Sequence, residues 1–151
     1  MSEMLGNHYF QLRKYMLAEQ TYESLSFPEL SSLKIQKKMI ICYTQTNKLQ
    51  KAFNLFAQMI ENDVETFLKS NLNADDCPCN DLIFRIENGE IKYENDLQTF
   101  TVLGILWMFC NYKTSLNYFK MAKNESPANE LIESTLALIE KYSNQISLKS
   151  N

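Results

Sequence analysis

The chain contains few of the residues that interrupt helices. Only three glycines and three prolines occur among its 151 residues. Because glycine and proline are the residues least favoured inside a helix, their scarcity favours long helices. The same scarcity excludes a glycine-rich loop of the kind that holds a phosphate group. A hydrophobic content of 45% also excludes a disordered chain. We therefore expect a single folded domain that is all-α.

An excess of positive charge and long apolar runs are also missing. Fifteen lysines and arginines face 18 acidic residues, which gives a net charge of -3. Nucleic-acid-binding domains usually carry a basic stripe, so a nucleic-acid partner is not expected. The longest strongly apolar run, residues 102–110, is too short to cross a bilayer. The first four residues lack the basic start and apolar stretch of a signal peptide. We expect no membrane partner and a cytoplasmic location.

Residues that carry out catalysis are scarce as well. His8 is the only histidine, and we expect it to be a helix surface residue rather than a catalytic base. No serine or cysteine has a recognisable base partner in a motif, so we expect no enzyme and no cofactor. Cys42 and Cys110 lie in apolar stretches that predict helices. A free cysteine in such a place usually behaves as a small buried hydrophobic residue.

One cysteine motif offers an alternative function. In the run Asp75-Asp76-Cys77-Pro78-Cys79, two thiols lie one residue apart. They could supply half of a zinc site or a redox pair. Zinc needs about four ligands, and neighbouring carboxylates disfavour the thiolate that both uses require. We favour an ordinary loop and no metal site, and we keep a metal- or redox-responsive module that uses Cys77 and Cys79 as the alternative.

The strongest pattern that is present is a repeat of 34 residues. Positions of like chemical type recur at this offset: Tyr9 and Tyr43, Tyr15 and Leu49, Ala18 and Ala52, and Tyr22 and Phe56. In each copy the apolar spacing predicts two amphipathic helices. Short turns join the helices at residues 13–14 and 46–48. The small alanines lie where two helices would cross closely.

A third copy begins at Phe100, with its connecting turn one residue shorter. Its matching positions are Phe100, Leu103-Gly104, Trp107, Tyr112, Ser115, Phe119, Ala122 and Pro127. The three copies cover about residues 3–30, 33–65 and 97–127. Residues 128–142 then predict a C-terminal capping helix that covers the last repeat. The polar end, residues 143–151, is expected to fray.

Residues 66–96 interrupt the period and predict an insertion. Apolar residues alternate with polar ones on both sides of Asn88-Gly89, which is a strong signal for a β-hairpin. The competing interpretation is a short helix over residues 81–88, with Gly89 as its C-terminal cap. A degenerate helical repeat also stays open. We favour the hairpin.

These residues resemble the tetratricopeptide-repeat (TPR) family. Its helix-turn-helix unit is matched in the first copy by Leu5-Gly6, Tyr9, Tyr15, Ala18 and Tyr22. The second copy departs from it because Ile40 replaces the glycine. The resemblance implies TPR-like stacked hairpins that form an α-α superhelix. It also implies a non-catalytic protein-protein interaction module, whose first helices line a concave groove for a partner protein or peptide.

The resemblance also implies which residues would line that groove. Lys34, Lys37 and Lys38 form a basic cluster at helical spacing that could bind an acidic peptide. The clamp with which some TPR proteins hold an acidic tail is not expected, because Glu3 stands where that clamp needs a cation. Short arrays leave apolar ends exposed, so a homo-oligomer is a further expectation. The groove candidates are Asn7, Phe10, Gln11, Lys34, Lys37, Lys38, Ile41, Thr44, Gln45, Gln98, Thr101, Ile105, Met108 and Phe109.

Overall fold

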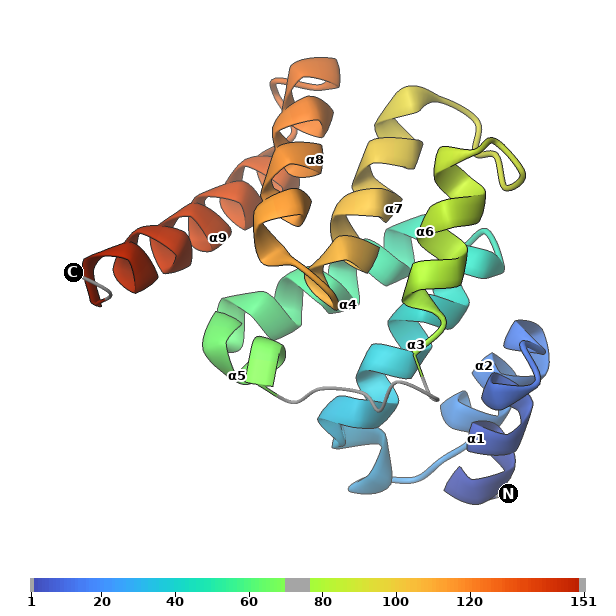
Figure 1. Ribbon diagram of the computed structural model, residues 1–151. Coiled ribbons are helices and arrows are strands. Elements are labelled where there is room, and N and C mark those ends of the chain that lie inside the picture. The colour runs from blue at the N-terminus through green and yellow to red at the C-terminus, as the bar shows by residue number, and fades with distance from the viewer. Residues whose placement is uncertain (1, 70–76, 150–151) are drawn as a thin grey trace. The chain divides into compact units, whose positions relative to one another are not determined.

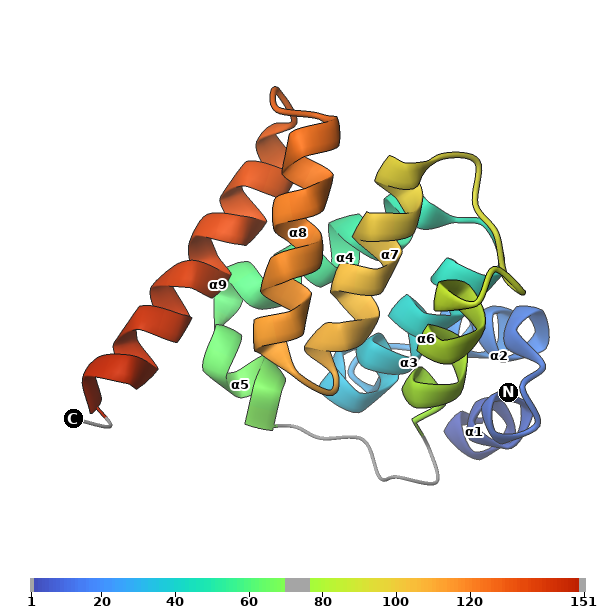
Figure 2. The same cartoon turned by 45° about the horizontal axis from the view of Figure 1, so that its top comes forward.

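The fold is known from a computed structural model that describes residues 2–69 and 77–149 (Figures 1 and 2). Within these two stretches all regular elements are helices and no strand occurs. The all-α prediction is therefore confirmed for the described part of the chain. The chain divides into two compact units, residues 1–56 with 70–78 and residues 57–69 with 79–151, and the boundary falls inside helix α4. That the chain is one domain stays a prediction.

The first unit contains two helical hairpins with the same turn. Helices α1 (Glu3–Gln11) and α2 (Tyr15–Glu23) form the first hairpin and lie side by side (Figure 1). A short 3-10 helix, η1 (Glu29–Ser31), precedes α3 (Leu33–Gln45), which packs against α2 and is followed by α4 (Leu49–Asn62). Arg13 and Asn47, 34 residues apart, both have positive φ, 62° and 60°. The predicted period therefore appears in the backbone itself.

Hydrogen bonds repeat at the same offset in these two turns. The Lys14 N–H donates to the Tyr9 carbonyl at 2.9 Å, and the Lys48 N–H donates to the Tyr43 carbonyl at 3.0 Å. Ala18 and Ala52 are both fully buried, as their small size predicted. These matches confirm the helical repeat over the first two copies.

The second unit contains the third hairpin and the C-terminal helix. Helices α7 (Asp96–Met108) and α8 (Tyr112–Glu125) lie side by side, and α9 (Glu130–Lys149) packs against α8. The short α5 (Val64–Lys69) also touches α9, and α6 (Cys79–Glu87) packs on α7 (Figure 2). A capping helix is thus present, but it continues beyond residue 142. The prediction that the end frays is wrong for residues 143–149, since Ile146 extends the apolar stripe of Leu138 and Tyr142 along the same face.

The predicted β-hairpin is also wrong, because α6 occupies its place. Leu82, Ile83 and Ile86 are buried, which is helical spacing, whereas Phe84 is 62% exposed. Alternating apolar residues therefore misled the prediction. Gly89 has a φ of 79° and ends the helix. Its N–H donates to Ile86 at 3.1 Å, and the N–H of Glu90 donates to Arg85 at 2.8 Å, which is the Schellman pattern. The helical alternative was correct. Residues 70–76 of the predicted insertion lie outside the described residues.

Thr135 offers a first test of the packing in α9. Its side chain is buried, yet its hydroxyl has no hydrogen-bond partner in the described part of the chain. Since an unsatisfied buried hydroxyl costs about 1 kcal/mol or more, we expect Thr135→Val to raise the free energy of unfolding by about 1 kcal/mol. Denaturant titration measures the change.

Thr21 provides the matched control for this substitution. It is buried too, but its hydroxyl donates to the Leu17 carbonyl at 2.8 Å. Thr21→Val should therefore not stabilise the protein. Equal effects of the two substitutions would contradict the argument from the unsatisfied hydroxyl.

Candidate functional site

The candidate site is built on α1, beginning with a close contact between helices. The Ser2 hydroxyl caps α1 by accepting a hydrogen bond from the Leu5 N–H at 3.2 Å. One turn further, Gly6 lies directly against the buried ring of Tyr22 on α2. A Cβ atom at Gly6 would stand only 2.5 Å from the Tyr22 ring. Glycine therefore lets the ring lie across α1, and the Tyr22 hydroxyl reaches the next residue of α1.

That next residue is Asn7, and its amide is held in one orientation. The Tyr22 hydroxyl donates to Asn7 Oδ1 at 2.7 Å, and Lys38 Nζ from α3 donates to the same oxygen at 3.1 Å. An ammonium group can only donate, so the atom facing Lys38 must be the amide oxygen. Lys38 also lies over the Phe10 ring, 5.7 Å from its centroid. The Asn7 NH₂ group consequently points away from these partners.

A shallow hollow covers this part of α1. Asn7 lines it together with Glu3, Met4, His8 and Gln11. Met4 is 81% exposed, and Glu3, His8 and Gln11 are exposed too. Within the described part of the chain, the Asn7 side chain makes hydrogen bonds only through its oxygen. Its two amide hydrogens are thus fixed donors that a molecule in the hollow can meet.

The groove residues predicted in the first unit divide into two groups. Asn7 and Gln11 line the hollow, Lys38 orients Asn7, and Lys34 is exposed. The others are buried or half-buried: Phe10, Lys37, Ile41, Thr44 and Gln45. The lysines therefore do not form a continuous basic surface, because Lys37 and Lys38 are buried. Helical spacing identified the shared face of α3 but could not tell how deeply that face is buried.

The groove residues predicted in the second unit are mostly core. Ile105 and Met108 are buried, and Phe109 packs its ring against Phe67 with centroids 5.4 Å apart. Thr101 is half-buried and donates its hydroxyl hydrogen to the Leu97 carbonyl at 2.7 Å. Gln98 accepts a hydrogen bond from the Glu94 N–H at 3.0 Å, at the start of α7. These side chains stabilise the unit and offer little surface to a partner.

Sequence reasoning missed four residues of the site. Glu3, Met4 and His8 line the hollow, and Tyr22 orients Asn7. The spacing of Glu3 and Met4 before Asn7 and His8 could have identified a shared helical face. Nothing in the sequence pairs Tyr22 with Asn7, which lie 15 residues apart. His8 is exposed, as we expected.

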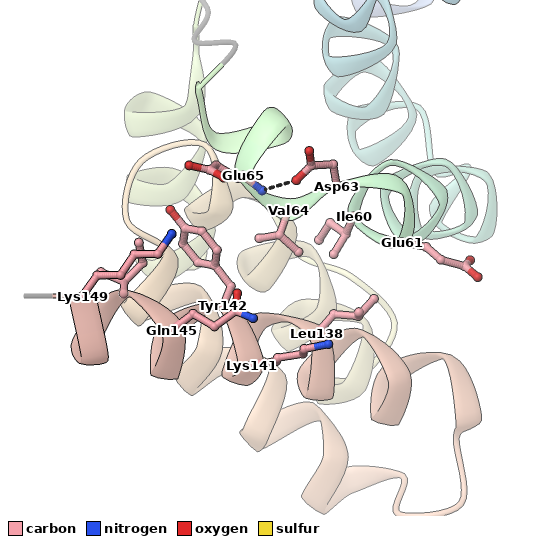
Figure 3. A pocket seen from close by; sticks show the side chains of 11 residues that line it. Ile60, Glu61, Asp63, Val64, Glu65, Leu138, Lys141, Tyr142, Gln145 and Lys149 are labelled. Carbon is pink, nitrogen blue, oxygen red and sulfur yellow. Dashed lines mark hydrogen bonds between the residues drawn. The ribbon is translucent and has the colours of Figure 1, made fainter.

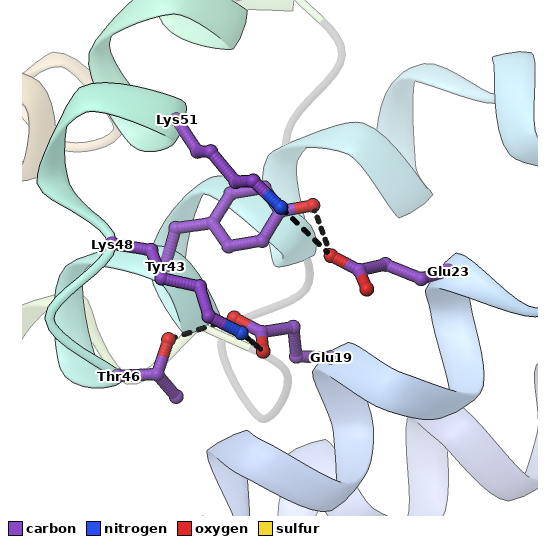
Figure 4. Close-up of polar contacts among 6 residues, drawn as sticks. All are labelled: Glu19, Glu23, Tyr43, Thr46, Lys48 and Lys51. Atoms are coloured by element: carbon purple, nitrogen blue, oxygen red, sulfur yellow. Dashed lines mark hydrogen bonds and ion pairs between the residues drawn. The ribbon is translucent and has the colours of Figure 1, made fainter.

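A second polar cluster joins α2 to the turn between α3 and α4 (Figure 4). Glu19 is completely buried, accepts a hydrogen bond from Thr46 Oγ1 at 2.7 Å and forms an ion pair with Lys48. One turn along α2, Glu23 accepts a hydrogen bond from the Tyr43 hydroxyl at 2.7 Å. Burial of Glu19 leaves it no access to a substrate. We therefore assign this cluster to stability rather than to a site.

The cysteines give no sign of a metal site in the described part of the chain. No three histidine, cysteine or acidic side chains gather there in a way that could hold a metal ion. Cys79 and Cys42 are buried, and burial raises the pKa of the Cys42 thiol far above its ordinary value. Cys110 is exposed, so the expectation that it is buried is wrong: α7 ends at Met108, before it. Its thiol lies 3.6 Å from Asn80 Oδ1. Asp75 and Asp76 lie outside the described residues.

Comparison with known proteins identified no relative of this chain. No family model matches the chain, and neither the curated proteins nor the solved structures contain a significant match. None of the described helices has the length and apolar character needed to cross a membrane.

Proposed function

We propose that this protein is a non-catalytic interaction module that binds an extended segment of a partner protein against α1, at the hollow around Asn7. The observation that carries the proposal is the fixed orientation of the Asn7 amide, whose oxygen is held by Tyr22 and Lys38. The 34-residue helical repeat supports a TPR-like superhelix, and a cytoplasmic location is part of the same proposal.

The chemistry of the hollow suits a peptide backbone. An extended segment exposes carbonyl oxygens, and the Asn7 NH₂ group is a donor that can bind one of them. Because the amide is already oriented, little side-chain entropy is lost on binding. Gln11 lies one helical turn, about 6 Å, from Asn7 on the same face. That is close to the distance between alternate carbonyls of an extended chain, about 6.6 Å.

The side chains around Asn7 supply contacts for a partner's side chains. Met4 is exposed beside it, and a flexible thioether adapts to differently shaped apolar groups. Glu3 and His8 add polar groups at the rim of the hollow. This combination can hold a segment without demanding one sequence. We expect the partner's backbone to be recognised more strictly than its side chains.

Asn7→Asp is the sharpest test of this proposal. The substitution keeps an oxygen for Tyr22 and Lys38, so the fold should survive, but it replaces the NH₂ donor by a second acceptor oxygen. We expect the affinity for the partner segment to fall about 100-fold, because a buried carbonyl would then face a carboxylate. Proteins captured from cell extract by the full-length chain identify the segment, and calorimetry on the purified segment measures its affinity.

Asn117→Asp is the matched control, since it makes the same chemical change at an exposed position of α8. It should bind the segment as the unaltered chain does. If Asn7→Asp folds normally and binds with unchanged affinity, the site does not lie at Asn7 and the proposal fails.

A further inference from the structure

A cleft in the second unit lies between α9 and the junction of α4 with α5 (Figure 3). Its volume is about 210 Å³, many times the space that one water molecule occupies. The aliphatic side chains of Ile60, Val64, Leu138 and Ile146 line it. These four side chains form an apolar part of a lining that is otherwise polar or charged, and an aliphatic side chain could pack against them.

The two walls of this cleft carry opposite charges. Glu61, Asp63 and Glu65 stand on the wall formed by α4 and α5, whereas Lys141 and Lys149 stand on the α9 wall (Figure 3). A molecule with charge of only one sign would be attracted by one wall and repelled by the other. An occupant that carries both signs in a matching arrangement suits the cleft better.

Internal contacts neutralise part of this charge. Asp63 accepts hydrogen bonds from the Glu65 N–H at 3.0 Å and from the Thr66 hydroxyl at 2.6 Å, and Lys69 pairs with Glu65 at 2.8 Å. These contacts hold the pKa of both carboxyl groups below their ordinary values, Asp63 mainly through Thr66 and Glu65 mainly through Lys69.

Lys149 on the α9 wall makes no hydrogen bond or ion pair within the described residues, but its charge helps to lower the pKa of Glu65. Glu61 and Lys141 make no hydrogen bond or ion pair with another residue of the described part of the chain. They are therefore the opposite charges that remain to be met by an occupant of the cleft.

An exposed leucine stands next to the basic wall. Leu148 on α9 is 76% exposed. It follows Gln145 by three residues and Lys141 by seven, so these three side chains share one side of the helix. The cleft thus combines a group of aliphatic side chains, an exposed leucine on the neighbouring face of α9 and unpaired charges of both signs. A contact between two copies related by a two-fold axis would use all of these features. In such a contact the acidic wall of each copy faces the basic wall of the other, and the exposed leucine of each copy faces the aliphatic side chains of the other.

We propose that this cleft is a homodimer contact, in which Leu148 of each copy packs against the aliphatic side chains of the other copy's cleft and Glu61 pairs with Lys141 of the other copy. The contact is small, so the dimer is expected to be in exchange with the monomer rather than permanent. The proposal concerns only the second unit and does not depend on the binding site at Asn7.

Mass measured against concentration tests the proposal. For the full chain, whose single-copy mass is 17.7 kDa, sedimentation should show reversible growth to twice that mass. Leu148→Glu and Lys141→Glu should each raise the dimer Kd by about 100-fold, because each substitution acts twice in a symmetric contact. Lys120→Glu, the same charge change at an exposed site on α8, should leave Kd unchanged.

Mixing two variants gives a stricter test. Glu61→Lys and Lys141→Glu should each be monomeric alone, since each places like charges opposite one another. An equimolar mixture restores both attractive pairs and should dimerise again, while circular dichroism confirms that each variant is folded. A single-copy mass for the unaltered chain at every concentration would overturn the proposal. So would a dimer that survives these substitutions, or a cross-linker at Gln145 that captures only other proteins.

Discussion

Glu19→Ala is expected to lower the free energy of unfolding by about 3 kcal/mol. Glu19 is fully buried on α2 and holds both Thr46 and Lys48, which flank the turn between α3 and α4. Alanine removes two hydrogen bonds to the carboxylate, one from an ammonium group and one from a hydroxyl, and it leaves a cavity where the carboxylate was. Denaturant unfolding followed by circular dichroism measures the loss.

Glu23→Ala is the matched control on the same helix. Glu23 lies one turn further along α2, but it is exposed, and Lys51 is 4.0 Å away. Exposed ion pairs contribute about 1 kcal/mol or less, and the hydrogen bond from the Tyr43 hydroxyl adds about 1 kcal/mol, so this substitution should cost less than Glu19→Ala. Burial raises the pKa of the Tyr43 hydroxyl, and the hydrogen bond to Glu23 raises it further. Glu23→Ala should therefore lower that pKa without restoring its ordinary value.

Substitution of Glu19 and substitution of Lys48 should lower the free energy of unfolding by different amounts. Lys48 is 42% exposed and can turn to water, whereas the carboxylate of Glu19 cannot. Lys48→Met leaves a buried charge with only the Thr46 hydroxyl as partner, so it should destabilise the protein more than Glu19→Gln does. Equal losses, or a larger loss for Glu19→Gln, would show that burial of the charge does not control the stability of this cluster.

Gly6→Ala is expected to lower the free energy of unfolding by about 2 kcal/mol. The new Cβ would stand 2.5 Å from Cε1 and 2.7 Å from Cδ1 of Tyr22. Alanine normally favours a helix by about 1 kcal/mol over glycine, so a net loss requires the clash to outweigh that gain. The Tyr22 ring cannot move aside easily, because its hydroxyl donates a hydrogen bond to Asn7 Oδ1. The same substitution should therefore also weaken partner binding.

A double-mutant cycle separates this clash from a loss of helix stability. Tyr22→Leu removes the ring, so Gly6→Ala should cost much less in that background than in the unaltered chain. Gly104 and Phe119 repeat the arrangement in the second unit, where a Cβ would stand 2.9 Å from the ring. Gly104→Ala with Phe119→Leu should show the same non-additivity. Additive effects in both cycles would contradict the close-contact explanation.

Much of the fold could be predicted because local signals agreed with one another. The period placed the turns at residues 13–14 and 46–48, and the structure has residues of positive φ in both. Tyr15 and Leu49 begin helices α2 and α4, as the repeat predicted. The positions of these turns and helix starts depend on apolar spacing within one helix and on a turn of a few residues. Both features can be recognised in the sequence without knowledge of contacts between distant residues.

The insertion shows where local reading failed. The stretch 82–86 fits a period of two if Phe84 is counted as buried and a helical period if Ile83 is. Only packing against α7 shows that Ile83 is inside and Phe84 outside. Asn88-Gly89 is equally compatible with a hairpin turn and with a helix end, since both need positive φ at the glycine. The local sequence of this stretch is therefore compatible with both a hairpin and a helix, and only tertiary contacts decide between them.

The candidate site was predicted only in part for the same reason. Asn7 and Gln11 were named from their place on the first helix, and they line the hollow. That Asn7 is oriented by Tyr22 and Lys38 depends on residues 15 and 31 positions away in the sequence. The depth at which Lys37 lies depends on what covers α3. No pattern within a single helix contains this information.

The sequence by itself therefore determined the helical class, the repeat and its turns, because each depends on interactions over a few residues. The tertiary structure alone decided which faces are buried, which amide is locked and which charges remain unpaired. These properties arise between residues that are distant in the chain, so a pattern of spacing can show that side chains share a face but not what that face meets.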